Sequence, residues 1–155
     1  MNIREQIDSH EYLYFWEISE PDVNVLRVII DEAKASNDVD VEIPDTPFMG
    51  NPIVSDETCR RYEITFPSYV AYAVLNESFA SVDKYEQYTG RYFRTYSKSH
   101  FLDYLRAATF ASDDYPGKST HYEIACLDHI VEVVSAAEPQ IREIARLTAV
   151  PSKVV

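Results

Sequence analysis

The chain has 155 residues, a length typical of one domain, and its 46% hydrophobic share is that of a folded protein rather than a disordered one. It carries 14 lysines and arginines against 26 aspartates and glutamates, so its net charge is −12. Such a surface repels phosphate backbones and anionic lipid headgroups, which excludes nucleic acid and membranes as principal partners, whereas a basic protein partner is attracted.

The start of the chain gives no indication of export. Residues 1–8 lack the apolar core of a signal peptide, and the longest uncharged apolar run, residues 69–75, is too short to span a bilayer. We therefore expect a cytoplasmic protein whose two cysteines, Cys59 and Cys126, stay reduced.

In chain order, the first patterns predict a β-hairpin followed by an acidic loop. Residues 12–18 alternate at period two, as a half-buried strand does. The face that they share consists of Tyr12, Tyr14, Trp16 and Ile18. A turn at residues 21–22 leads into a second strand, whose apolar face is formed by Leu26, Val28 and Ile30. Residues 36–52 are acidic and punctuated by prolines, which predicts a long loop.

Three more strands are predicted in the middle of the chain. Residues 60–66 alternate, with the inward positions occupied by Tyr62, Ile64 and Phe66. Pro67 interrupts this pattern, and residues 69–75 have the continuous apolar run of a strand buried on both faces. After a turn at residues 89–90, a strand over residues 91–96 has one side formed by Tyr92, Arg94 and Tyr96.

The hydrophobic period then changes to that of a helix. Ser97 or Ser99 can cap a helix whose apolar stripe comprises Phe101, Leu102, Leu105 and Ala108. Residues 121–126 and 130–134 predict two further strands, and Pro139 is placed to begin a short final helix. The sequence thus predicts one α+β domain over residues 1–155, with about seven mainly antiparallel strands and one or two helices packed against the sheet.

Several kinds of active site are excluded by the glycines and cysteines. The three glycines stand far apart, so neither a glycine-rich phosphate loop nor a glycine-flanked serine nucleophile can be assembled. Two distant cysteines also exclude a four-cysteine zinc ribbon. We expect no cofactor, and we favour a non-enzymatic role over that of an unrecognised enzyme.

One candidate site remains near the predicted strand at residues 121–126. It comprises His121, Glu123, Cys126 and His129. Imidazole, carboxylate and thiol groups suit zinc coordination, and a cysteine beside a histidine suits nucleophilic chemistry. The alternative is that the cysteine is a small buried apolar residue and the histidines are ordinary surface or hydrogen-bonded positions.

A second candidate lies at the junction of the predicted strand and helix. It comprises Arg94, Tyr96, His100, Asp103 and Tyr104. A helix N-terminus favours anions and an arginine adds a bidentate donor, so this group could line a small-molecule pocket. The alternative, which we favour, is a hydrogen-bonded network that ties the helix to the sheet.

Two further candidates are surfaces for a protein partner. One is the aromatic face formed by Tyr12, Tyr14 and Trp16, because such side chains often anchor interfaces, although core packing is the stronger expectation. The other is an acidic segment containing Asp38, Asp40, Glu42 and Asp45. Its carboxylates would attract a basic surface, and its alternative role is that of a solvated face.

A resemblance to known proteins is carried by Tyr96-Ser97-Lys98-Ser99-His100-Phe101-Leu102-Asp103-Tyr104, followed by His121-Tyr122 and Val131-Glu132-Val133-Val134-Ser135. These segments resemble small uncharacterised acidic bacterial proteins, some of which are similar to immunity proteins encoded beside secreted toxins. The resemblance implies an inhibitor-like binding module and identifies no functional residue.

With the charge of −12, these observations predict a non-enzymatic interaction protein, an immunity-type inhibitor of a basic partner such as a nuclease toxin. The alternative is a small-molecule- or metal-binding domain, or an unrecognised enzyme, centred on His121, Glu123 and Arg94. A homodimer joined through a strand edge or the aromatic face is compatible with either hypothesis.

Overall fold

The computed structural model describes residues 1–37, 40–81 and 83–146, and it confirms the predicted α+β architecture. Within these residues, two α-helices and one 3-10 helix accompany twelve strands. The helices are α1 (Ile3–Ser9), η1 (Glu77–Phe79) and α2 (His100–Ala108). The strands are β1 (Tyr12–Asp22), β2 (Val25–Ala35), β3 (Val41–Glu42), β4 (Met49–Gly50), β5 (Ile53–Val54), β6 (Arg61–Phe66), β7 (Tyr69–Asn76), β8 (Gln87–Thr89), β9 (Phe93–Lys98), β10 (Thr120–Ala125), β11 (His129–Ser135) and β12 (Gln140–Ile144).

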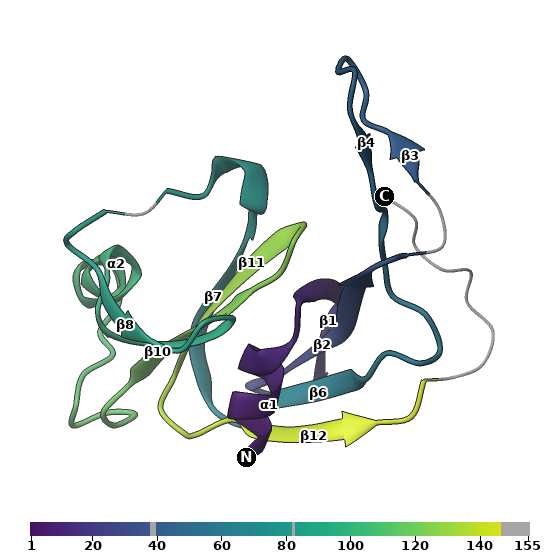
Figure 1. Cartoon of the computed structure of the whole chain (residues 1–155). Coiled ribbons are helices and arrows are strands. Elements are labelled where there is room, and N and C mark those ends of the chain that lie inside the picture. Colours follow the sequence, from purple (N-terminus) through teal and green to yellow (C-terminus); the bar gives the residue numbers. More distant parts are fainter. Residues whose placement is uncertain (38–39, 82, 147–155) are drawn as a thin grey trace.

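The strands form two five-stranded sheets and one small hairpin. The first sheet has the order β1-β2-β6-β12 with β5 paired to β2, and the second has the order β7-β11-β10-β9-β8. Every pairing between these strands is antiparallel, as the absence of strand–helix–strand repeats predicts. The hairpin of β3 and β4 stands away from both sheets (Figure 1).

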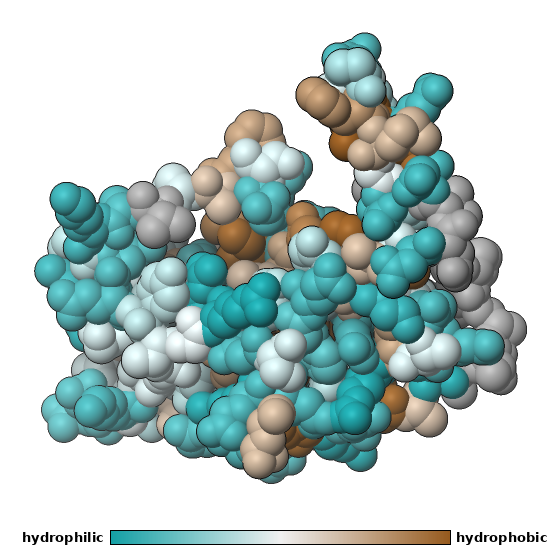
Figure 2. All heavy atoms as spheres, in the orientation of Figure 1, coloured by the Kyte–Doolittle hydropathy of each residue, from teal (hydrophilic) through white to brown (hydrophobic). Residues whose placement is uncertain are grey.

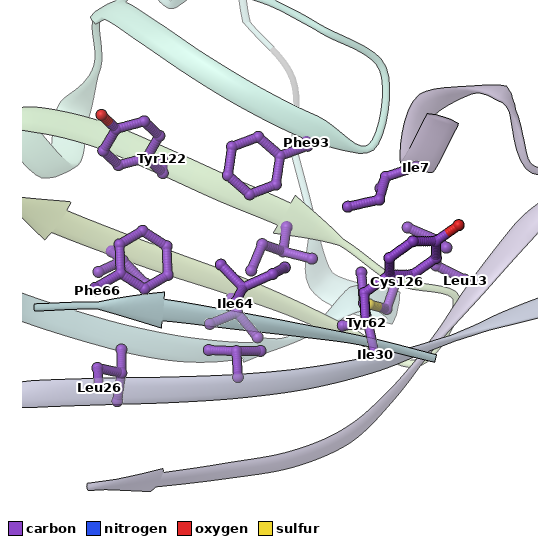
Figure 3. Packing of buried hydrophobic residues seen from close by; sticks show 14 residues of the cluster. Ile7, Leu13, Leu26, Ile30, Tyr62, Ile64, Phe66, Phe93, Tyr122 and Cys126 are labelled. Atoms are coloured by element: carbon purple, nitrogen blue, oxygen red, sulfur yellow. The ribbon is translucent and has the colours of Figure 1, made fainter. Parts of the chain in front are cut away.

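The main hydrophobic core lies between the two large sheets. The predicted inward positions of β2 and β6 all belong to it, namely Leu26, Val28, Ile30, Tyr62, Ile64 and Phe66. The second sheet contributes Phe93, Tyr122, Ile124, Val131 and Val133. Figure 3 shows these side chains meeting from opposite sides, with Ile7 of α1 closing one end. Each buried side chain of this size stabilises the fold by about 1.5–3 kcal/mol.

Helix α1 was not predicted, although its start signal is present in the sequence. Asn2 accepts a hydrogen bond from the backbone N–H of Glu5, and the Glu5 carboxylate accepts one from the backbone N–H of Asn2. This reciprocal capping box begins a helix of seven residues whose buried side chain is Ile7. Its small size, with one buried residue, leaves little hydrophobic periodicity to detect.

The predicted face of β1 is wrong beyond its first residues because a bulge interrupts the strand. Phe15 pairs with Ile30 and Glu17 pairs with Ile29, so Trp16 is the extra residue between them. Leu13 and Phe15 pack toward the main core before the bulge, and Ile18 does so after it. The four residues of the predicted face therefore do not share one side of the strand. The hairpin itself is confirmed, but its turn lies at residues 23–24, where Asn24 adopts φ 60°.

Two other expectations about local structure are wrong. Residues 140–144 form strand β12 at the edge of the first sheet instead of a helix, because backbone pairing with β6 outweighs the local preference after Pro139. Strand β7 is not buried on both faces, since it lies at the edge of the second sheet and leaves Tyr72, Val74 and Leu75 exposed.

Helix α2 is confirmed and lies on the face of the second sheet that points away from the first (Figure 1). Its N-cap is Ser99, whose hydroxyl oxygen accepts a hydrogen bond from the backbone N–H of Leu102. Leu102 and Leu105 form a smaller core with Val134 of β11. The helix therefore covers only part of this face and leaves the remainder open for a cavity.

Candidate functional site

A cavity of about 370 Å³ lies between α2, the segment that follows η1 and the uncovered part of the second sheet. Alternation along β10 explains which side chains reach it, because Tyr122 and Ile124 face the main core and Glu123 faces the opposite side. The aromatic walls of the cavity are formed by Phe79, Tyr88, Tyr96, Phe101 and Tyr104. Its charged lining includes Asp83, Glu86, Arg94, Glu123 and Glu132.

Strand register brings the charged groups on the floor into one row. Glu123 of β10 pairs directly with Arg94 of β9 on one side and with Glu132 of β11 on the other. Like charges in directly opposed positions destabilise an antiparallel sheet, so the two glutamates need different environments. The remaining contacts of each carboxylate show how they differ.

The Glu123 carboxylate is fully engaged. Its Oε1 accepts a hydrogen bond of 2.6 Å from Nη1 of Arg94, and its Oε2 accepts one of 2.7 Å from the Tyr96 hydroxyl. Burial and the hydrogen bond to Glu123 raise the pKa of Tyr96, so its hydroxyl remains a donor. The Arg94 guanidinium also lies over the Tyr88 ring, 4.7 Å from its centroid. The negative charge of Glu123 is therefore compensated by Arg94 within the protein.

Glu132 has no comparable partner in the described part of the chain. Nε2 of His121 lies 3.9 Å from Oε1 of Glu132, which is beyond hydrogen-bonding distance. Burial, reinforced by repulsion from Glu123 and Glu86, raises the pKa of Glu132 to about 7. This cavity carboxyl group therefore gains or loses its proton near neutral pH.

His121 lies beneath the cavity and is 0% exposed. Its Nδ1 is 2.8 Å from the Ser99 hydroxyl oxygen, which accepts a hydrogen bond from Leu102 N–H. The Ser99 hydroxyl can donate its own proton to Nδ1, and in that tautomer Nε2 carries the ring hydrogen. That Nε2 is buried and has no hydrogen-bond partner among the described residues. Burial lowers the pKa of His121 to about 4, so the ring is neutral at physiological pH.

The rim of the cavity is a separate hydrogen-bonded group. The ring of His100 stacks on Tyr85 at 4.7 Å, and its Nε2 is 2.6 Å from Oδ2 of Asp83, which raises the pKa of His100. Asp103 accepts a hydrogen bond from the Tyr85 hydroxyl and does not line the cavity. The group predicted at the strand–helix junction thus forms both a pocket wall and a network tying α2 to the loop before β8.

The predicted metal or nucleophile group does not converge. Cys126 lies in the main core, on the opposite side of the second sheet from His121 and Glu123, where burial raises the pKa of its thiol well above the usual range. The ring of His129 packs against Phe15 with centroids 4.6 Å apart. Across the residues that the structure describes, no group of three or more His, Cys, Asp or Glu side chains is arranged to hold a metal ion.

Glu132 and Glu86 were not recognised from the sequence. A lone carboxylate in the apolar run at residues 130–134 was the available signal for Glu132. Its place in the cavity beside Glu123 depends on the register between β10 and β11, and neither strand alone specifies that register.

A second candidate site is the hairpin of β3 and β4 with its connecting turn, residues 40–50, here called the arm. In the arm, the backbone N–H of Ile43 donates to the carbonyl of Phe48, and the turn contains Asp45 at φ 61°. Its exposed apolar side chains are Val41, Ile43, Phe48 and Met49.

The predicted acidic residues Asp40, Glu42 and Asp45 are exposed beside these apolar side chains of the arm, whereas Asp38 lies outside the described residues. Figure 2 shows the arm as a projection that carries hydrophobic surface.

The predicted aromatic face is mostly occupied by contacts within the protein. Tyr14 is 5% exposed, and its hydroxyl donates to the carbonyl of Ile53. Trp16 is half-buried, and the Arg61 guanidinium lies over its ring at 4.2 Å. Tyr12 is half-buried at the beginning of β1. Tyr14 is thus buried as the core-packing alternative expects, whereas Trp16 and Tyr12 are only half-buried.

Comparison of the chain with protein-family models, curated proteins and solved structures finds no match in any of the three. Among the described residues, no helix combines the length and apolar character that crossing a membrane requires.

Proposed function

We propose that this protein is a non-enzymatic binding protein for a basic protein partner, with the role of an immunity-type inhibitor of a partner such as a nuclease toxin. The observation that carries this proposal is the arm, which combines exposed apolar side chains with carboxylates on a projecting hairpin. The following two features of the arm support a protein interface.

The apolar side chains of the arm have the exposure expected of interface anchors. Phe48 is 66% exposed and Met49 is 56% exposed, although both belong to residue types that normally stabilise a core. A two-stranded hairpin is marginally stable by itself, and these side chains contribute little to it while they face solvent. Burying them in a partner would stabilise both the arm and the complex.

The charge of the arm selects a basic partner. No lysine or arginine occurs between Lys34 and Arg60, whereas the arm alone presents Asp40, Glu42 and Asp45. Carboxylates around an apolar centre increase the association rate with a positively charged surface and oppose acidic partners. A nuclease toxin has such a surface because it must attract a phosphate backbone.

The proposal is tested by affinity capture from the native host with three baits. These are the wild-type chain, a Phe48→Ala/Met49→Ala variant, and Val23→Ala as the control, since Val23 is exposed on the distant β1–β2 turn. We expect one basic protein to be retained by the wild type and by Val23→Ala and to be lost from the arm variant. The captured protein, when a nuclease, should also be inhibited by the wild type.

The charge contribution is tested separately on the captured partner. An Asp40→Asn/Glu42→Gln/Asp45→Asn variant should associate more slowly at low salt, with a dissociation rate close to that of the wild type. Recovery of no basic protein, or equal recovery by the arm variant and by Val23→Ala, would reject the proposed function.

A further inference from the structure

The cavity beside α2 has a chemistry of its own, independent of the arm. Aromatic side chains form its walls, while four carboxylates and one arginine line it. The arginine, Arg94, is already paired with Glu123, so the lining retains an excess of negative charge. Ring faces and carboxylates both attract cations, and an anion would meet carboxylates with no unpaired arginine to receive it.

Of the two glutamates on the cavity floor, Glu132 is the one with unused hydrogen-bonding capacity. Glu123 has both oxygens occupied, whereas no described residue donates a hydrogen bond to Glu132. A second observation points to the same place, since the fully buried Nε2 of His121 faces Glu132 without a partner of its own among the described residues. A cation in the cavity would stabilise Glu132 as a carboxylate, and that carboxylate would offer the Nε2–H of His121 an acceptor.

We propose that this cavity binds an alkylammonium ion, with the ammonium group on Glu132 and the methylene chain against the aromatic walls. The ammonium group supplies the N–H donors that Glu132 lacks, and the rings provide apolar contact and cation–π attraction. The volume of about 370 Å³ falls within the range of small-ligand pockets and accommodates a short alkyl chain.

The test is an NMR titration of the full ¹⁵N-labelled chain near neutral pH with butylammonium, butanol and butyrate. Butylammonium should cause saturable shifts in the amides of cavity residues, and its affinity should exceed those of the neutral and anionic analogues by at least about tenfold. Equal affinity for butanol would overturn the proposal, because the cavity would then recognise only the alkyl chain.

The role of Glu132 is tested with two variants that remove the same charge. Glu132→Gln should weaken butylammonium binding by at least about tenfold, whereas Glu57→Gln, an exposed position on the loop between β5 and β6, should leave it unchanged. Unchanged binding by a folded Glu132→Gln protein would overturn the proposal, and its amide spectrum reports directly whether it is folded.

Protonation provides an independent readout of the same contact. Protons on Glu132 compete with the ligand, so the affinity should fall about tenfold between about pH 8 and about pH 6. The other titratable or charged groups around Glu132 are Glu123, Glu86, His121 and Arg94, with Asp83 and His100 at the rim. His100→Gln should retain the dependence and Glu132→Gln should abolish it, whereas the reverse result would assign it to the rim histidine and reject Glu132 as the ligand-binding group.

An alkylammonium group can come from a free amine or from a lysine side chain, and a blocked lysine distinguishes these sources. Binding of both butylammonium and Nα-acetyl-lysine methylamide would show a site open to a protein lysine. Binding of butylammonium alone would assign a free amine. The arm variant Phe48→Ala/Met49→Ala should bind both probes as the wild type does, so failure of this inference is distinguishable from failure of the proposed function.

Discussion

Replacing Glu132 by glutamine should stabilise the folded protein, and the gain should depend on pH. The burial that raises the pKa of Glu132 to about 7 also makes its ionisation unfavourable in the folded state. In the unfolded chain the same carboxyl ionises near its ordinary pKa of 4.5. Below that value both states are protonated and Glu132 resembles glutamine, so the substitution has little effect.

The magnitude follows from the difference between the two pKa values. As pH rises from 4.5 to 7, Glu132 loses its proton first in the unfolded state, so the contribution of Glu132 to the stability of the wild type falls. At about 1.4 kcal/mol for each pKa unit, the full penalty is about 3 kcal/mol above neutral pH, and it is about 1 kcal/mol at about pH 5. Glutamine carries no charge at any pH and escapes this penalty.

The assay is urea denaturation of the wild type, Glu132→Gln and the exposed control Glu57→Gln at about pH 5 and about pH 8.5. We expect Glu132→Gln to exceed the wild type by about 1 kcal/mol at the lower pH and about 3 kcal/mol at the higher pH. Glu57→Gln should stay within about 0.5 kcal/mol at both. The same difference at both pH values, or a Glu132→Gln protein less stable than the wild type at the higher pH, would contradict this prediction.

Two further substitutions test the contacts that support the fold. Ser99→Ala removes the cap of α2 and the partner of His121 Nδ1, so it should lower the free energy of unfolding by about 1–2 kcal/mol in urea, compared with less than about 0.5 kcal/mol for Ser97→Ala. Asp31→Ala leaves Arg61 and Arg146 without their shared buried carboxylate and should cost about 3–5 kcal/mol by the same measurement. Equal losses for Asp31→Ala and for Glu17→Ala, which breaks the more exposed ion pair with Arg27, would contradict the importance of burial.

Local alternation predicted the strands whose two faces differ clearly in polarity. Residues 61–66 alternate between polar and apolar side chains, and residues 26–30 place apolar side chains at every second position, so their inward positions follow from period two. Residues 12–16 are all apolar or aromatic, which allows either face to be buried and hides the bulge at Trp16. Strand β12 depends on pairing with β6, and Pro139 suits the start of a strand as well as that of a helix.

The candidate site was predictable to the extent that its residues are neighbours in sequence. Two-residue spacing placed His121 and Glu123 on one face, and the junction of β9 with α2 brought Arg94, Tyr96 and His100 to one cavity. Adding Glu132 required the register of β10 with β11, which no local pattern specifies. The two-residue alternation that places His121 and Glu123 on one face places Cys126 on the other, in the main core. The thiol is therefore separated from the other members of the predicted metal group.

The pair of His121 and Glu132 shows why the pH dependence of the wild type alone would conceal this site. Between about pH 4.5 and about pH 6.5, the unfolded chain carries a protonated histidine and an ionised glutamate, whereas burial keeps both groups neutral in the folded state. Folding in this window therefore moves one proton from the imidazole to the carboxyl and takes up none from solution. As pH rises through this window, the stability that Glu132 loses is offset by the stability that His121 regains. Only a substitution or a bound cation at Glu132 therefore separates the two contributions.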